Sequence, residues 1–251
     1  MKIYLITIKP RIMDITQQMQ QLRLHGMNHS WGMLKQTNKH MELSLQEGLE
    51  IMLQAEAEQR ENRRLHRLLR SAKFRYQASI EELQLASSRG LDKSLINLLA
   101  AGDYINNGES VLVTGATGCG KSFLVSALGH QACVQGYKVN YFNTQKLFLK
   151  IKLSRADGTI LKLLKQLSKV DVLILDDFGL AHMDHQQRMD LMELIEDRHN
   201  RKSTIIASQI PVPSWFEVIG EETIADAIID RLIHTSHKLE LKGESLRRKN
   251  L

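Results

Sequence analysis

The feature that most constrains the fold is the segment GATGCGKS at residues 115–122, which directly follows the apolar run VLVT. It matches the pattern G-x-x-x-x-G-K-[ST] in full, and this pattern is typical of a phosphate-binding loop between a strand and a helix. Backbone N–H groups surround the phosphates, the lysine reaches the β- and γ-phosphates, and the serine holds Mg²⁺. We therefore expect ATP and Mg²⁺ as cofactors. The predicted binding residues are Gly115, Ala116, Thr117, Gly118, Cys119, Gly120, Lys121 and Ser122.

Short β-branched runs alternate with helical segments from Glu109 onward. This alternation predicts an α/β domain in which helices cover both faces of a parallel sheet. The expected strands are VLVT (111–114), KVNYF (138–142), DVLILD (171–176), STIIAS (203–208) and KLELK (238–242).

Two adjacent carboxylates, Asp176 and Asp177, end the apolar run within LILDDFG at residues 173–179. Neighbouring side chains in a strand point to opposite faces, so we expect the two acids to serve different tasks without meeting the same atom. Asp176 is predicted to hold Mg²⁺ through water or Ser122. Asp177 is predicted to orient or activate the attacking water.

The part of the chain before this domain is predicted to be helical. Apolar positions from Ile12 to Leu22 indicate a short helix that ends near Gly26, and Ser44 with Glu47 forms a capping box that opens a long helix. Serines and glycines around a short helix at 91–101 indicate a connection. We expect a helical domain at 1–85, a linker at 86–108 and a nucleotide-binding α/β domain at 109–251.

Positive charge is concentrated between residues 60 and 75. This segment has seven basic residues and one glutamate, so its net charge is +6, the same as the formal net charge of the whole chain. On a helix, positions 60, 63, 67 and 70 share one face, which is either solvated or in contact with phosphates. A separate helical domain joined to an ATPase favours contact with the nucleic-acid backbone and little sequence preference. The candidate DNA-binding residues are Arg60, Arg63, Arg64, Arg67, Arg70 and Lys73.

The cysteine content and the hydropathy argue against a disulfide-rich protein and against a membrane-spanning protein. The chain has two cysteines, too few for a disulfide framework. No apolar run approaches the roughly 18 residues that a membrane span needs. We expect a soluble, cytoplasmic protein with no membrane partner.

Five motifs together carry a resemblance to a known family. With GATGCGKS and LILDDFG, the chain has ASQIPVPSWFEVIG at 207–220, TIADAIIDRL at 223–232 and LKGESLRRK at 241–249. Over roughly residues 11–250 it resembles the IstB-like helper ATPases of insertion sequences, which are related to the DnaC helicase loaders within the AAA+ class. The resemblance implies an AAA+ core with sheet order 5-1-4-3-2, an N-terminal helical DNA-binding domain and a transposase as partner.

The resemblance also implies roles for individual residues. Gln209 resembles the sensor beside the γ-phosphate, and Arg231 resembles an arginine finger that completes the site of a neighbouring subunit in a head-to-tail homo-oligomer. Asp177 stands where most AAA+ ATPases have Glu, and its shorter side chain would hold the attacking water less firmly; slow turnover would suit a timing switch, although the sequence does not give the turnover rate. Because the chain ends nine residues beyond Lys242, no helical lid domain is expected, and Arg247 and Arg248 belong to a basic tail or to a second sensor.

These features predict an ATP-dependent helper that assembles on duplex DNA and delivers or activates a transposase, with ATP hydrolysis as the switch. Two alternatives remain open. One is a DnaC-like loader whose helical domain grips a replicative helicase and favours single strands. The other is an interaction module that holds nucleotide without significant hydrolysis.

Overall fold

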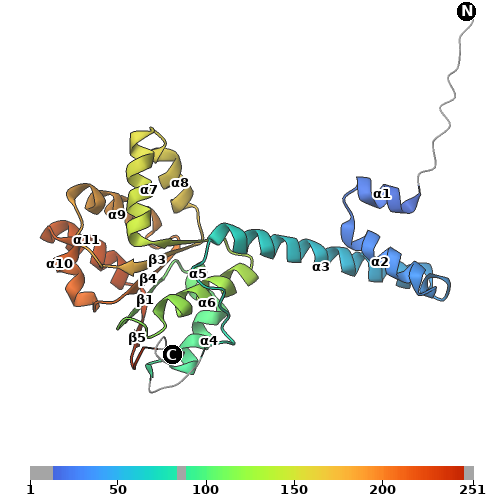
Figure 1. Cartoon of the computed structure of the whole chain (residues 1–251), viewed down its shortest axis with the longest axis horizontal. Coiled ribbons are helices and arrows are strands. Elements are labelled where there is room, and N and C mark those ends of the chain that lie inside the picture. Colours follow the sequence, from blue (N-terminus) through green and yellow to red (C-terminus); the bar gives the residue numbers. More distant parts are fainter. Residues whose placement is uncertain (1–13, 84–88, 246–251) are drawn as a thin grey trace, which may run out of the picture. The chain divides into compact units, whose positions relative to one another are not determined.

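The protein is described by a computed structural model, which covers residues 14–83 and 89–245 (Figure 1). Ile12, Arg247 and Arg248, which were named above, lie outside these ranges. The chain divides into two compact units, Met1–His66 and Arg67–Leu251. The domain limits expected from the sequence, at residues 85 and 109, stay predictions.

The first unit is helical, as predicted. It contains α1 (Ile15–Gln21), α2 (His25–Gln36), the 3-10 turn η1 (Lys39–Met41) and the first part of α3 (Leu45–Ala72). Met19, Leu34 and Met52 form its small core. The capping box at the start of α3 is confirmed, because the Ser44 amide donates to the Glu47 carboxylate at 2.8 Å and the Glu47 amide donates to Ser44 Oγ at 3.3 Å.

Gly26 does not end a helix, contrary to the expectation from the sequence. It lies in the first turn of α2, where a Cβ would come within 2.3 Å of the Ala55 carbonyl oxygen. The close approach lets the backbone N–H groups of Gly26 and Met27 donate to Glu56 Oε2 at 2.7 Å and 3.2 Å. A missing side chain, rather than a turn, explains this glycine.

The second unit contains a five-stranded parallel sheet, as predicted. Its strands pair in the order β2-β3-β4-β1-β5, which is the expected order 5-1-4-3-2. The three inner strands, β3, β4 and β1, are nearly continuous apolar runs buried on both faces. The strands are β1 (Ser110–Gly115), β2 (Val139–Asn143), β3 (Val172–Phe178), β4 (Ser203–Ser208) and β5 (Ser236–Leu241).

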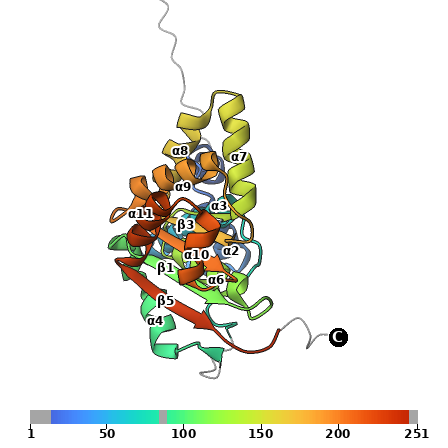
Figure 2. The same cartoon turned by 90° about the vertical axis from the view of Figure 1, so that its left-hand side faces the viewer.

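Helices cover both faces of this sheet, and Figures 1 and 2 show the strands between two groups of helices. One group is α4 (Lys93–Ala101), α5 (Asp103–Asn106) and α6 (Lys121–Val134). The other is α7 (Thr144–Ala156), α8 (Ile160–Ser168), α9 (His185–Arg198), η3 (Val212–Ser214), α10 (Trp215–Ile219) and α11 (Glu222–Ile233).

The second group of helices packs on the side chains of β3 that point toward it, including Leu173 and Leu175. Beyond β5, the described residues form no further helix. No helix within residues 14–83 and 89–245 is long and apolar enough to cross a membrane.

Parallel pairing brings the carboxyl ends of all five strands to one edge of the sheet. At this edge β1 leads into GATGCGKS, β3 carries Asp176 and Asp177, and β4 is followed by Gln209. In open α/β sheets this edge is where ligands bind. The fold therefore gathers the predicted site residues at one place.

Candidate nucleotide-binding site

The GATGCGKS loop connects β1 to α6, as predicted. Gly118 and Gly120 have φ of 83° and 103°, a left-handed conformation that residues with a Cβ rarely adopt. The space at Gly118 is also closed, because a Cβ there would lie 2.1 Å from Ser245 Oγ. The 14-residue helix α6 begins at Lys121, so its first amide groups are available to a phosphate in the loop.

The Lys121 side chain lies folded into this loop. The residue is buried, and its Nζ donates to the carbonyl oxygens of Gly115 at 2.7 Å and Ala116 at 2.8 Å. Both acceptors are neutral, so the ammonium charge is not cancelled within the loop. A phosphate group would form a stronger, charge-assisted hydrogen bond with it.

Asp176 is buried at the end of β3 and fixed by donors, with 1% of its side chain exposed. The Tyr141 hydroxyl donates to Asp176 Oδ2, and the Asp177 amide donates to Oδ1 at 2.9 Å. Burial, and then the hydrogen bond to Asp176, raises the pKa of Tyr141, which keeps the phenol protonated as a donor. Asp176 is thus a carboxylate of fixed orientation.

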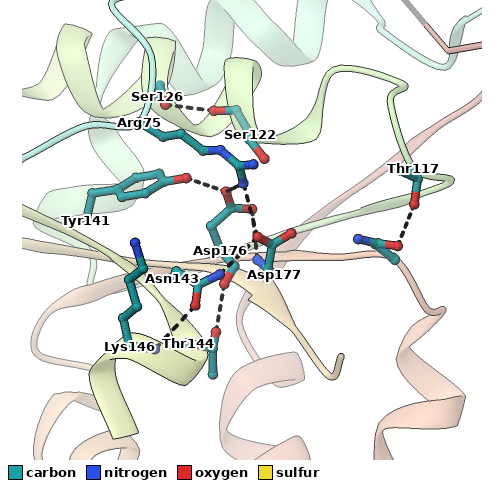
Figure 3. Close-up of polar contacts among 11 residues, drawn as sticks. Arg75, Thr117, Ser122, Ser126, Tyr141, Asn143, Thr144, Lys146, Asp176 and Asp177 are labelled. Carbon is teal, nitrogen blue, oxygen red and sulfur yellow. Dashed lines mark hydrogen bonds and ion pairs between the residues drawn. The ribbon is translucent and has the colours of Figure 1, made fainter. Parts of the chain in front are cut away.

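Asp177 does not point away from Asp176. Its φ is 55°, and the register between β3 and β4 shifts between Leu175 and Phe178. Because this irregularity breaks the strand alternation, the Oδ2 atoms of Asp176 and Asp177 lie 3.6 Å and 3.0 Å from one atom, Arg75 Nη1 (Figure 3). The expectation that the two acids meet different atoms is therefore wrong.

Sequence reasoning missed Arg75 and Asn143 at this acid pair. Arg75 contributed only to the charge of the basic segment, yet it lies beyond the end of α3 and contacts both acids. No local pattern marks it. Asn143, which donates to Asp177 Oδ2 at 2.9 Å, ends the strand that pairs with β3. The expected sheet order was a sufficient signal to place Asn143 beside the acids.

Gln209 contacts the phosphate-binding loop. The Thr117 hydroxyl donates to Gln209 Oε1 at 2.5 Å. Both residues line a cavity of about 500 Å³ together with Lys121, Ser122 and Asp177. The structure thus brings residues from the loop, Asp177 and the end of β4 around one cavity of a size usual for small-molecule sites.

The acid pair and Ser122 fit a magnesium ion. Mg²⁺ prefers oxygen ligands and is commonly held by one or two carboxylates together with substrate phosphates. Asp176, Asp177 and the Ser122 hydroxyl supply such oxygens next to the loop. Within the described residues no group of three or more His, Cys, Asp or Glu side chains could hold a metal without a ligand's help. A metal bound with the nucleotide suits this donor set.

Arg231 does not line this cavity. It lies on α11, where its Nε pairs with Glu196 Oε2 at 2.5 Å and its Nη1 donates to the Ala227 carbonyl oxygen at 2.9 Å. Its side chain is 27% exposed. The role of Arg231 as a finger for a neighbouring subunit stays a prediction.

The candidate DNA-binding residues differ in their surroundings. Arg60 pairs with the buried Glu56 at 2.7 Å, so it neutralises the carboxylate that holds the start of α2. Lys73 is exposed but follows the end of α3, with φ of 57°. The remaining four are exposed on α3, namely Arg63, Arg64, Arg67 and Arg70. Their contact with DNA stays a prediction.

Comparison with known proteins places this site in a family. The family model described as IstB-like ATP binding protein matches residues 17–251. The insertion sequence ATP-binding protein y4pL of Sinorhizobium fredii is 44% identical over 225 residues, which cover 90% of this chain and 92% of that protein. The ATP-binding protein of insertion sequence IS1162 from Pseudomonas fluorescens is 43% identical over 77% of this chain and 84% of its own length.

Solved structures share the fold at lower identity. The DnaC helicase loader superposes with a TM-score of 0.58 at 21% identity, covering 66% of this chain and 98% of that one. The replication initiator DnaA bound to AMPPCP and single-stranded DNA gives 0.57 at 18% identity, covering 68% and 52%. These likenesses show an AAA+ fold. Since the family model spans nearly the whole chain and relatives above 40% identity cover most of it, the chain belongs to the IstB-like ATP-binding proteins.

Proposed function

We propose that this protein is an ATP-hydrolysing helper of transposition that acts on DNA in the cytoplasm. One observation carries the proposal: the phosphate-binding loop, Asp177 of the acid pair and Gln209 line one cavity in a chain of the IstB-like family. Lysine, carboxylates and a polar sensor around one cavity are the parts that phosphoryl transfer to water requires.

Each side chain then has a task at the triphosphate. Lys121 binds the β- and γ-phosphates, while Ser122 and Asp176 hold Mg²⁺, which when bound supplies charge that stabilises the transition state. Asp177 orients the attacking water and accepts its proton, and Gln209 contacts the γ-phosphate. Arg231 of an adjacent subunit supplies positive charge when subunits assemble head to tail.

The proposed partners are duplex DNA and the transposase of the same element. Support for DNA comes from the exposed arginines of α3, which present several positive charges on one helix. Support for the transposase comes from the relatives, which are named as proteins of insertion sequences. In this scheme the ATP-bound form assembles on DNA and recruits or activates the transposase, and hydrolysis ends that state.

A binding experiment tests the proposal. Fluorescence anisotropy is measured for a labelled duplex and for its single strand, with Mg²⁺ and either ATP or ADP. We expect tight binding to the duplex with ATP, weaker binding with ADP, and no response to ATP in Lys121→Ala. ATP hydrolysis that rises with duplex is expected in parallel. Preference for the single strand would favour a helicase loader, and absence of hydrolysis would favour a module that only holds nucleotide.

A further inference from the structure

Arg75 is a charged residue of the cavity that the proposed function does not use. Its Nη1 lies 3.0 Å from Asp177 Oδ2 and 3.6 Å from Asp176 Oδ2, and 41% of its side chain is exposed. It also lines the 500 Å³ cavity together with Lys121 and Ser122. Figure 3 shows the guanidinium group between Ser122 and the two carboxylates. An arginine therefore lies against both carboxylates, of which Asp176 is the one assigned to the metal.

The backbone at Arg75 is anchored on both sides. Phe74 packs edge-on against Tyr141 with ring centroids 6.3 Å apart, and it covers Gly129 so closely that a Cβ there would lie 2.5 Å from its ring. Tyr76 packs against Phe123, the residue after Ser122, with centroids 6.2 Å apart. The position of residue 75 is thus set by its neighbours, while its long side chain retains rotatable bonds.

A guanidinium group and a divalent cation compete for these carboxylate oxygens and repel each other. Both are positive, and the two Oδ2 atoms that contact Arg75 belong to the residues that fit Mg²⁺. When ATP with its metal enters the cavity, the Arg75 side chain has to leave the acid pair. Two adjacent carboxylates, one of them buried, are costly without a cation, so one cation has to replace the other.

Charge decides where the Arg75 side chain goes. Arg75 and Asp177 also line a second cavity, of about 750 Å³. Its lining includes three lysines, Lys73, Lys146 and Lys150. This second cavity is positive and repels a guanidinium group. The first cavity would hold a triphosphate whose negative charge exceeds that of its metal, and an arginine fork matches phosphate oxygens. The triphosphate side is therefore favoured.

We propose that Arg75 is a nucleotide sensor in cis, which is ion-paired to Asp176 and Asp177 without nucleotide and binds the terminal phosphate when ATP and Mg²⁺ are bound. The terminal phosphate is the partner because Asp177, the closer of the two acids to Arg75, is assigned to the water that attacks it. Residue 75 lies three positions after the end of α3, so the sensor belongs to the segment that follows the arginine-bearing helix. This inference rests on the proposed binding of ATP.

The test compares ATP with ADP in Arg75→Gln. Dissociation constants for fluorescent ATP and ADP analogues are measured at saturating Mg²⁺, and their ratio is taken as the readout. Both nucleotides bring a metal and displace Arg75 from the acids, so that cost cancels in the ratio. We expect the preference for ATP over ADP to fall by roughly tenfold, the size of one charge-assisted hydrogen bond. An unchanged or larger preference would overturn the proposal.

Two further measurements separate this inference from other failures. Arg155→Gln is the matched control, because Arg155 is 43% exposed and pairs with the buried Asp190 on other elements of the same unit. It should leave the ratio unchanged. Arg75→Lys, which keeps the charge without the fork, should recover part of the preference. If the wild type binds neither nucleotide, the proposed function itself fails; if it binds both and Arg75→Gln matches it, only the sensor is wrong.

Discussion

At the scale of single residues, the acid pair shows how one backbone irregularity redirects chemistry. The positive φ of Asp177 turns its carboxylate to the same side as that of Asp176, where both contact Arg75. Their surroundings nevertheless differ. The Asp176 side chain is 1% exposed and accepts a hydrogen bond from the Tyr141 hydroxyl, whereas the Asp177 side chain is 19% exposed and accepts one from the Asn143 amide group. The buried acid suits a metal and the more accessible one suits water.

Asparagine at each position should therefore give a different defect. Asp176→Asn removes the buried charge that would hold the metal, so Mg²⁺-dependent ATP binding should weaken by roughly tenfold or more. Asp177→Asn should bind ATP with Mg²⁺ nearly as the wild type does but hydrolyse it at least about a hundredfold more slowly. Nucleotide titrations with and without EDTA and single-turnover hydrolysis measure the two effects. Identical binding curves for the two variants would contradict the division of tasks.

At the scale of elements, Arg198 shows how the helices are tied to the sheet. It ends α9 with 1% of its surface exposed and donates to three backbone carbonyl groups and one hydroxyl. The acceptors are the carbonyl groups of Leu167, Val170 and Ser203 and the hydroxyl of Thr204. A single side chain thus joins the end of α9 to the end of α8 and the start of β4.

Replacing this side chain should be costly. Arg198→Leu leaves buried carbonyl groups without donors, and we expect the free energy of unfolding to fall by about 3 kcal/mol. Urea denaturation followed by circular dichroism measures it. Arg201→Leu, at an exposed position in the following turn, is the control and should change stability by less than about 0.5 kcal/mol. Equal effects from both variants would mean that the Arg198 bonds contribute nothing specific.

Helix α3 is the element on which DNA binding depends in our proposal. Replacing Arg63, Arg67 and Arg70 together by alanine should weaken binding to all duplex sequences alike. The slope of log affinity against log salt concentration should become shallower by about one unit per arginine, because fewer counterions are released.

Affinity measured between low and moderate salt gives this slope. The control replaces three exposed lysines by alanine and loses the same charge. Two of them lie on α8 and one directly follows it, namely Lys162, Lys165 and Lys169. The control should leave the slope near that of the wild type. If both sets of substitutions make the slope equally shallower, only the net charge of the protein matters. If neither set changes the slope, the arginines form a solvated helix face that does not contact DNA.

At the scale of the whole molecule, the role proposed for Arg231 depends on assembly of several subunits. It does not line the cavity of its own chain and pairs with Glu196, so its predicted contact with phosphate requires a second subunit. Hydrolysis should then rise with protein concentration and with DNA. Arg231→Ala should bind ATP normally and lose the stimulated turnover.

Mixing two inactive variants tests whether Arg231 acts between subunits. Lys121→Ala subunits lack a working site and keep the arginine, while Arg231→Ala subunits keep a site and lack the arginine. Mixtures on DNA should recover part of the turnover that each variant has lost. Crosslinking shows whether the two variants assemble together. If they do and the ATP turnover of the mixture remains the sum of the rates of the two variants alone, Arg231 acts within its own subunit or has only a structural role.

The sequence by itself determined those parts that contiguous residues encode. The strand, loop and helix at GATGCGKS, the five strands and the capping box at Ser44 follow from local backbone preferences and side-chain periodicity, and the structure confirms them. The predicted strand order was also correct. It came from the resemblance to a family, because the residues of a strand do not indicate which other strands pair with it.

Only the tertiary structure decided which distant side chains meet. Arg75 and Asp177 are 102 positions apart, and Thr117 and Gln209 are 92 apart. Arg75 looked like one more charge in a basic segment, because charge and spacing do not reveal that α3 ends at Ala72 and that two aromatic neighbours anchor the next turn of chain. The alternation rule failed at Asp177 because an irregular strand places successive side chains on one side, and only the paired neighbour strand shows that irregularity.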